Sequence, residues 1–343
     1  MLRRRLVSTL GANSISQAVN TAIQLASVPL FLALWKKEHY GEWLLLASIP
    51  GYLSLAEGGF STMTANEVAM FIANGKHLEA KRSLDTACTF LAAISSTLLA
   101  AAIAGAWLIP WRSLLRISSD NEVGVAWTVF LLSAYTIVGL SLSIAASLYR
   151  ASYKVPRIVI LLSGGRVVEL MATTVAICVS SRFVVLAAAL LGSRLLTAII
   201  LYIDGLNVSP NLRLGFSNFS YQEMKRTWRS SLSFMAFPLG NAFYFQGLTL
   251  LVGGMIGPAS VVTFNTTRTM TRLIVQGNMI LKHSTWPEFS YLVGARELPK
   301  ARRLNALAFE VTWVSTLLIA GCLLITGPSI MSIWTRHEVV LGR

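Results

Sequence analysis

Nine apolar stretches, each long enough to cross a lipid bilayer, dominate this sequence of 343 residues. A transmembrane helix needs about 20 mainly apolar residues. The stretches cover residues 12–35, 41–63, 84–109, 124–149, 156–179, 183–204, 229–252, 258–281 and 304–326. Charged residues make up only 13% of the chain, against about 25% in soluble domains. We therefore predict an all-helical, polytopic membrane protein with nine transmembrane helices, and we exclude a soluble globular or disordered chain.

Positive charge is distributed unevenly among the loops between these stretches. The chain carries 29 Lys and Arg against 15 Asp and Glu, a net charge of +14. If the N-terminus is cytoplasmic, 18 of the basic residues fall on the cytoplasmic side and 7 on the outer side. Cytoplasmic loops of membrane proteins are rich in Lys and Arg, so we expect a multi-pass protein with a cytoplasmic N-terminus. This bias accounts for the positive charge, and no nucleic acid partner is expected.

The longest connection, at 205–228, divides the predicted helices into two groups. It contains Pro210, Gly215 and a short amphipathic stretch at 221–226, which can lie on the inner membrane surface. We predict three domains, which are an N-lobe of six transmembrane helices at 1–205, a cytoplasmic linker with a short amphipathic helix at 206–228, and a C-lobe of three transmembrane helices at 229–343.

A weak internal repeat supports the two groups. Segment 75–82 resembles segment 294–302, with an offset of 219 at the glycine, and Pro110 matches Pro328 at an offset of 218. Both copies start from the same side of the membrane, which indicates a parallel repeat, of the kind built around an axis along the membrane normal. A complete second lobe would extend to about residue 425 at the same offset. We therefore expect a 6+6 arrangement whose last three helices are missing from this sequence.

Three short motifs resemble a known family. The segment at 58–70, Gly-Gly-Phe-Ser-Thr-Met-Thr-Ala-Asn-Glu-Val-Ala-Met, is followed by Asn74-Gly75-Lys76, and two further motifs lie at 148–151 and 165–169. They are similar to polysaccharide (O-antigen) flippases of the multidrug/oligosaccharidyl-lipid/polysaccharide (MOP) exporter superfamily. The resemblance implies two six-helix lobes forming a V around a central cavity in the bacterial inner membrane. It also implies a polyprenyl-diphosphate-linked oligosaccharide as cargo, flipped from the inner to the outer leaflet for polysaccharide or lipopolysaccharide biosynthesis.

One predicted helix carries a polar face with two positive charges. Asn265, Arg268, Arg272 and Gln276 recur at spacings of three and four residues, so they share one side of the helix at 258–281. Charges inside the bilayer are costly and usually face a cavity or a partner. Two arginines one turn apart suit a diphosphate or an acidic sugar. The alternative is an ion pair with an acidic residue of another helix.

The first predicted helix carries a face of amides. Gln17, Asn20 and Gln24 follow Asn13 at spacings of four, three and four residues. Side-chain amides can hydrogen-bond to sugar hydroxyls, and we include the three in the predicted cargo site. They can equally bond a neighbouring helix.

Five further charged residues are candidates for ion pairs or ion coupling, four of them within predicted helices and Glu67 near the inner membrane surface. Glu57 is a candidate coupling-ion site or an ion-pair partner of Arg268 or Arg272. Glu67 is expected to pair with a nearby Lys or Arg. Arg166 and Glu169 are three residues apart and can pair on one helix, whereas Arg194 can pair with Glu169 or face the cavity.

Enzyme motifs are missing from the sequence. It has neither an Asp-x-Asp nor a Gly-x-Ser-x-Gly motif, and no nucleotide-binding loop. We therefore expect a transporter without a catalytic residue, metal site or cofactor, driven by an ion gradient or the membrane potential. The expected partners are lipid-linked oligosaccharide, membrane lipids and polysaccharide-assembly proteins. Two alternatives remain, a multidrug exporter, whose cargo is typically cationic, and a membrane component of a polysaccharide-assembly complex.

Overall fold

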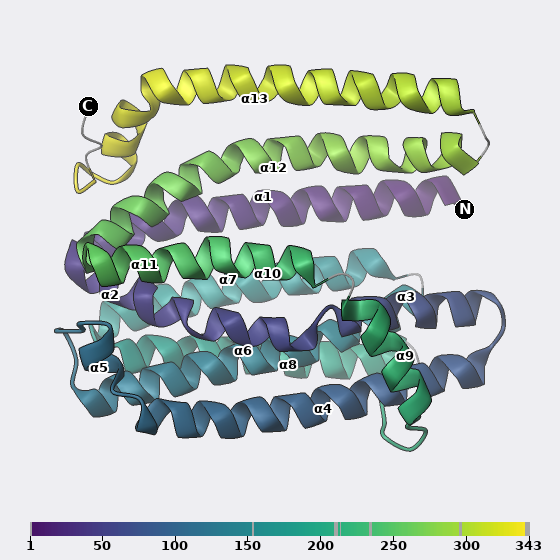
Figure 1. Ribbon diagram of the computed structural model, residues 1–343, viewed down its shortest axis with the longest axis horizontal. Helices are drawn as coiled ribbons and strands as arrows, with labels where there is room; N and C mark the ends of the chain where they lie inside the picture. Colours follow the sequence, from purple (N-terminus) through teal and green to yellow (C-terminus); the bar gives the residue numbers. More distant parts are fainter. Residues whose placement is uncertain are drawn as a thin grey trace. The chain divides into compact units, whose positions relative to one another are not determined.

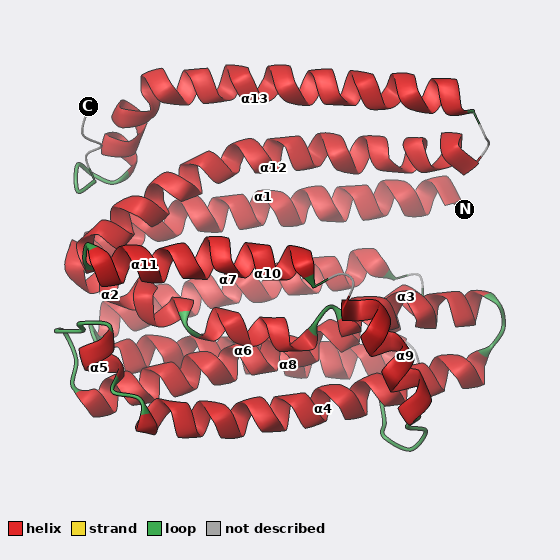
Figure 2. Ribbon diagram, in the orientation of Figure 1, coloured by secondary structure: helices red, strands yellow, loops and turns green. Residues whose placement is uncertain are grey.

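A computed structural model describes residues 2–152, 154–208, 212, 214–232, 235–294 and 297–339. Throughout these residues the chain forms helices joined by turns and loops, without strands (Figures 1 and 2). This confirms the predicted all-helical class. In chain order the elements are α1 (Leu2–Leu34), α2 (Lys37–Ser48), η1 (Pro50–Glu57), α3 (Phe60–Ala73), α4 (His77–Leu108), α5 (Trp111–Leu114), α6 (Glu122–Ala151), α7 (Val155–Val179), α8 (Phe183–Val208), α9 (Tyr221–Leu232), α10 (Ala236–Ala242), η2 (Phe243–Gly247), α11 (Leu248–Met255), α12 (Pro258–Gly294) and α13 (Leu298–Trp334).

Six helices of the described chain are long and apolar enough to cross a membrane. They are Gly11–Leu34 within α1, α4, Glu122–Arg150 within α6, α7, α8 and α13. Each contains most or all of one predicted stretch, and this supports a multi-pass membrane protein. The predicted count of nine is not confirmed, because in the part of the chain that the structure describes the other three stretches do not form long apolar helices.

The stretch at 41–63 was expected to be one helix, and this expectation is wrong. It is divided among α2, the 3₁₀ helix η1 and α3. Pro50 begins η1, where its missing N–H costs no helical hydrogen bond. Gly58 and Gly59 then adopt left-handed conformations, with φ of 58° and 75°. Glycine takes this conformation without a Cβ penalty, so the break follows from the Gly58-Gly59 pair.

The stretches at 229–252 and 258–281 also differ from the expectation. The first stretch is divided among four elements, which are the end of α9, α10, the π-helical turn η2 and part of α11. The second lies within the continuous helix α12, but its polar side chains keep α12 out of the group of helices apolar enough to span. The short amphipathic helix predicted within the linker is present as α9.

The chain divides by packing into two compact units. Unit 1 comprises Met1–Ile23 and Leu34–Val261, and unit 2 comprises Gln24–Ala33 and Val262–Arg343. These are groups of packed residues, and the predicted lobes at 1–205 and 229–343, joined by the linker at 206–228, stay a prediction. The same holds for the expected helices beyond residue 343.

Unit 1 has a core built around α6. This helix packs against α3, α4, α7 and α8 (Figure 1). It begins at Glu122 because the Asn121 side chain accepts a hydrogen bond from the Gly124 N–H at 2.7 Å, which caps the helix. Leu84, Tyr149 and Leu201 are fully buried where α4, α6 and α8 meet. The core therefore fixes the relative positions of the polar side chains on these helices.

Candidate functional site

The polar face of α12 lies in unit 2. The Arg268 guanidinium donates a hydrogen bond to the Asn265 side-chain oxygen one turn away and lies 5.1 Å from the centroid of the Phe264 ring. Arg268 is half-buried, whereas Arg272 is exposed. The amide and the aromatic face both hold the guanidinium in place. The predicted pattern thus produces a cationic helix face with a positioned arginine.

The C-terminal end of α1 contributes to the same unit. Gln276 donates a hydrogen bond to the side-chain oxygen of Gln24 at 3.0 Å. The indole of Trp334 donates to the backbone oxygen of Leu25 at 2.8 Å, which holds this part of α1 against α13. The structure therefore places Gln24 of α1 beside the face of α12 that carries the arginines.

The other amides of α1 lie in unit 1. Asn20 accepts a hydrogen bond from the Arg166 guanidinium of α7. This is the helix-to-helix bond that was the alternative to a sugar contact. Gln17 is half-buried one turn earlier. The three predicted amides therefore divide between the units, with Gln24 in one and Gln17 and Asn20 in the other.

Glu169 pairs with a residue of the next helix. Its carboxylate lies 3.8 Å from an Arg194 nitrogen, and the Arg194 guanidinium lies 4.6 Å from the centroid of the Tyr135 ring. Arg166 turns instead to Asn20. Of the two pairs considered for Glu169, the one with Arg194 of α8 is therefore present, and the one with Arg166 within α7 is not. Packing brings Arg194 to the carboxylate, and sequence spacing contains no information on this approach.

Glu57 lies at the helix break between η1 and α3. Its carboxylate accepts hydrogen bonds from the Ser61 N–H and from the Ser143 hydroxyl of α6, both at 3.2 Å. The Ser61 and Ser143 oxygens are 2.7 Å apart. The Ser61 contact places a negative charge at the N-terminus of α3, where the helix dipole is positive. A half-buried carboxylate and two hydroxyls thus meet where the backbone leaves the helical conformation.

Glu67 joins α3, α4 and α9. It pairs with Arg226 at 3.3 Å and accepts hydrogen bonds from Ser83 and Thr227, both also at 3.3 Å. The expected partner, a nearby basic residue, is therefore present, and it belongs to the amphipathic helix. Burial raises the pKa of the neighbouring Glu223 carboxyl, and the positive charge of Arg226 opposes this effect.

Sequence reasoning missed two buried carboxylates. Asp85 of α4 is fully buried and accepts hydrogen bonds from Lys81 at 2.6 Å and from the side chain and backbone N–H of Asn218. Glu42 of α2 is 1% exposed and accepts three hydrogen bonds from Ser118 and Ser119. An acidic residue within the first turn of an apolar stretch was the available signal. Both anchor a loop to a helix.

Asp204 of α8 joins this helix to α6 and α7. Its carboxylate accepts hydrogen bonds from the Tyr149 hydroxyl at 2.8 Å and from an Arg157 nitrogen at 2.9 Å. Among the residues described, no three His, Cys, Asp or Glu side chains gather as metal ligands would. The described residues thus provide a cationic helix face, a pair of amides and carboxylates bonded to hydroxyls. These groups can bind a ligand through hydrogen bonds and charge.

Comparisons with solved structures place the fold. An inward-facing multidrug resistance MATE family transporter of the MOP superfamily matches with a TM-score of 0.71 and 16% identity, over 93% of this chain and 77% of that one. An outward-facing one has a TM-score of 0.66 and 15% identity, over 97% and 76%. A MOP superfamily transporter from Pyrococcus furiosus gives 0.69 and 16%, over 96% and 74%.

These matches show that the chain shares the fold of MATE and other MOP superfamily transporters, which was expected from the sequence motifs. No family model matches the sequence, and no curated protein is significantly similar to it. The comparisons therefore support the expected fold, and the resemblance to polysaccharide flippases stays a prediction.

Proposed function

We propose that this chain is a transporter that flips polyprenyl-diphosphate-linked oligosaccharide from the inner to the outer leaflet of the bacterial inner membrane. The N-terminus lies in the cytoplasm in this proposal, and the protein works by alternating access without catalysing a reaction. The similar folds include both an inward-facing and an outward-facing transporter, and they support alternating access. The cargo assignment depends on the chemistry of this chain's own side chains.

The observation that carries the cargo assignment is the cationic face of α12. Arg268 and Arg272 lie one turn apart, and Arg268 is held by Asn265 and Phe264. Guanidinium groups bind phosphate oxygens through charge-assisted, often bidentate hydrogen bonds. Each such bond contributes roughly 1.5–3 kcal/mol. Two arginines therefore match the two phosphates that link the lipid to the sugar.

Paired amides supply the sugar-binding part of the proposal. Gln24 and Gln276 bond each other at 3.0 Å, and side-chain amides carry both donors and acceptors, the groups that hydroxyls bind. Sugar hydroxyls can bond to such groups in the same geometry that the amides use with each other. Gln17 and Asn20 of unit 1 stay in the proposal as predicted contacts.

Glu57 is the proposed coupling-ion site. A carboxylate at an interrupted helix, with two hydroxyl oxygens beside it, offers oxygen ligands to Na⁺ or a site for a proton. Glu67, Arg166, Glu169 and Arg194 are already engaged in hydrogen bonds or ion pairs that join helices. We therefore assign these four a structural role.

Multidrug export is the second candidate, because the inward- and outward-facing neighbours are multidrug resistance transporters. A cationic drug would be repelled by the α12 arginines, and this favours an anionic cargo. For the Pyrococcus furiosus transporter, reversed polarity of the binding pocket suggests a different function. Pocket charge can thus change function on one fold. A non-transporting role in a polysaccharide-assembly complex remains the third candidate.

Direct binding tests the cargo assignment. The full chain in lipid nanodiscs is titrated with a fluorescent oligosaccharide linked to undecaprenyl diphosphate, and with the cationic dye ethidium. We expect the double variant R268Q/R272Q to bind the diphosphate at least about 100-fold more weakly, because two or more charge-assisted hydrogen bonds are lost. The matched control is R302Q/R303Q, which removes the same charge from two exposed residues of α13 and should bind as the wild type.

Three outcomes contradict the cargo assignment. An equal loss of affinity in R268Q/R272Q and R302Q/R303Q would mean that the net charge of the protein alone attracts the lipid. Unchanged affinity of R268Q/R272Q would remove these arginines from the site. Tighter binding of ethidium than of the diphosphate would favour multidrug export.

A further inference from the structure

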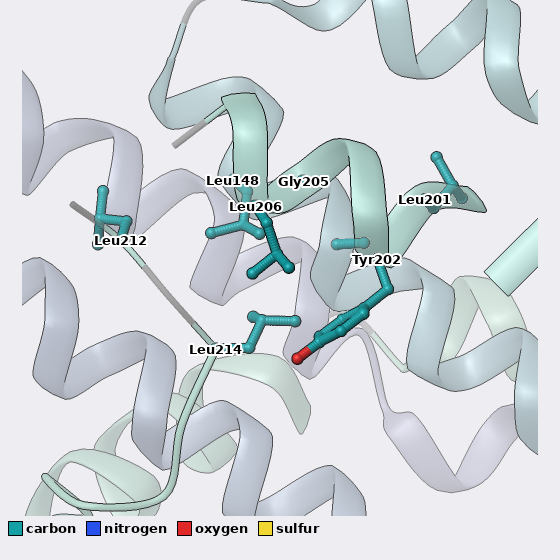
Figure 3. A pocket seen from close by; sticks show the side chains of 8 residues that line it. Leu148, Leu201, Tyr202, Gly205, Leu206, Leu212 and Leu214 are labelled. Atoms are coloured by element: carbon teal, nitrogen blue, oxygen red, sulfur yellow. The ribbon is translucent and has the colours of Figure 1, made fainter. Parts of the chain in front are cut away.

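Unit 1 contains a pocket of about 320 Å³ between α4, α6, α8 and the loop at 214–216. Leu91 and Ile144 line it together with Tyr202, which also lines a smaller cavity of about 10 Å³ (Figure 3). Leu214 is the other shared residue. The small cavity is apolar and near the lower volume limit for one water molecule. Only the larger pocket can hold part of an organic molecule.

The pocket lies along helices that are apolar enough to cross a membrane. Its α4 wall runs from Cys88 to Ser95, a length of about 10 Å along the helix. On α8, Ile199, Ile203 and Leu206 are exposed on the same face as Tyr202, which is 57% exposed. A stripe of apolar side chains therefore leads from the membrane-facing surface of α8 to the edge of the pocket.

The loop that closes one side of the pocket is firmly anchored. Asp85 accepts hydrogen bonds from Ser217 and Asn218, and Thr86 accepts one from the Ser220 N–H at 3.1 Å. Because Asp85 is fully buried, these bonds are protected from competition with water. The pocket is thus preformed and does not depend on an occupant to hold the loop.

The loop leads directly into a basic helix. Lys225, Arg226 and Arg229 of α9 outnumber its single acidic residue, Glu223. The helix packs against α3 and α4, and Arg82 of α4 is exposed. Basic side chains at the end of a transmembrane bundle attract anionic lipid headgroups, by about 1 kcal/mol per residue near the surface.

We propose that this pocket binds one acyl chain of an anionic phospholipid, whose headgroup lies against the basic residues of α9 and α4. Apolar walls, a lipid-facing entrance and a basic rim match the two parts of such a lipid. The bound lipid would stabilise the contact of the loop and α9 with α4. This site needs only that unit 1 spans a membrane, and it is separate from the proposed cargo site in unit 2.

Photolabelling of the full chain in nanodiscs tests the site. The probe is phosphatidylglycerol with a photoactivatable group on one acyl chain, and labelled peptides are identified by mass spectrometry. We expect labels at 88–95, at Tyr202 and at 214–216. In A92W the indole fills the pocket, and labelling should fall about tenfold, as expected when about two methylene groups are excluded. The second variant, S141W, obstructs the pocket from α6 and should act in the same way.

The matched control is A104W. Ala92 and Ala104 are both exposed on α4 and lie about 18 Å apart along the helix, so only the first substitution enters the pocket. Wild-type labelling in both A92W and S141W would overturn the site. Equal labelling by phosphatidylcholine, or preferential labelling by a polyprenyl phosphate, would overturn the assignment to an anionic phospholipid. Equal thermal unfolding midpoints of A92W and A104W would show that lost labelling does not reflect misfolding.

Discussion

Asp85 and Glu79 lie on the same helix and each faces a lysine, but only Asp85 is buried. Lys81 lies 2.6 Å from the fully buried Asp85 carboxylate, which also holds the loop at 217–218. Lys76 and Glu79 are 3.5 Å apart with exposed side chains. Exposed pairs contribute little because water screens them, whereas loss of a buried acceptor leaves its donors unsatisfied.

We therefore predict that D85N lowers the free energy of unfolding by about 2 kcal/mol, the value typical of a hydrogen bond to a charged group. E79Q makes the same chemical change at the exposed pair and should cost less than about 0.5 kcal/mol. Thermal unfolding of both variants in detergent, followed by tryptophan fluorescence, measures the difference. Similar losses in the two variants would show that burial does not set the contribution of Asp85.

Contacts within one helix were easier to predict from the sequence than contacts between helices. The repeat of Asn265, Arg268, Arg272 and Gln276 along one helix determines a shared face, and the Asn265–Arg268 bond confirms their proximity. Spacing also predicted a pair between Arg166 and Glu169, but Arg194 is the residue that reaches the carboxylate. Contacts within a helix follow from its 3.6-residue period, whereas contacts between helices depend on packing that one sequence does not display.

The same limit applies to whole elements. Six predicted stretches correspond to helices that are long and apolar enough to cross a membrane. Length and composition are sufficient to predict such helices. The stretch at 41–63 is also rich in apolar residues, but it contains Gly58 and Gly59, which end η1 and precede α3 in left-handed conformations. Hydropathy does not register this break. Glycine can adopt helical as well as left-handed conformations, so a glycine pair in an apolar stretch is not sufficient to predict an interrupted helix.

The break at Gly59 gives a prediction with an internal control. A Cβ at Gly59 would meet no atom within 4 Å, so G59A tests the backbone conformation alone. We expect it to lower stability by about 1–2 kcal/mol, the cost of a left-handed conformation for alanine. Gly254 lies within α11 and is equally open, so G254A should raise stability by about 1 kcal/mol through helix propensity. The thermal unfolding midpoint should therefore fall in G59A and rise in G254A. A higher midpoint in G59A would contradict a left-handed conformation at this position.

At the scale of the whole molecule, the strongest sequence signal was also the simplest. Low charge and nine long apolar stretches predicted a helical membrane protein, and the shared fold of MATE and MOP superfamily transporters agrees with it. The cargo depends on few side chains, and two chains with this fold and about 16% identity can differ at all of them. Function within the fold therefore has to be tested at specific residues.

Coupling between the ion gradient and cargo movement is the property that needs the complete molecule. If Glu57 binds the coupling ion, its charge must change the balance between the inward- and outward-facing states. The E57Q variant keeps a side chain of similar size that can still bond Ser61 and Ser143, but it removes the charge. We therefore expect E57Q to bind lipid-linked oligosaccharide normally and to flip it at the same rate with and without a gradient.

Proteoliposomes with an imposed pH or Na⁺ gradient provide the measurement, with the exposed fraction of a labelled lipid-linked oligosaccharide as the readout. E67Q is the control, because Glu67 is also a half-buried carboxylate of the same region but pairs with Arg226. The wild type and E67Q should flip faster when one of the gradients is present, and that gradient identifies the ion. Stimulation of E57Q equal to that of the wild type would assign coupling to another residue. Loss of stimulation in both variants would indicate a general structural role of the carboxylates at η1 and α3. An ion site at Glu57 alone cannot explain an effect of E67Q.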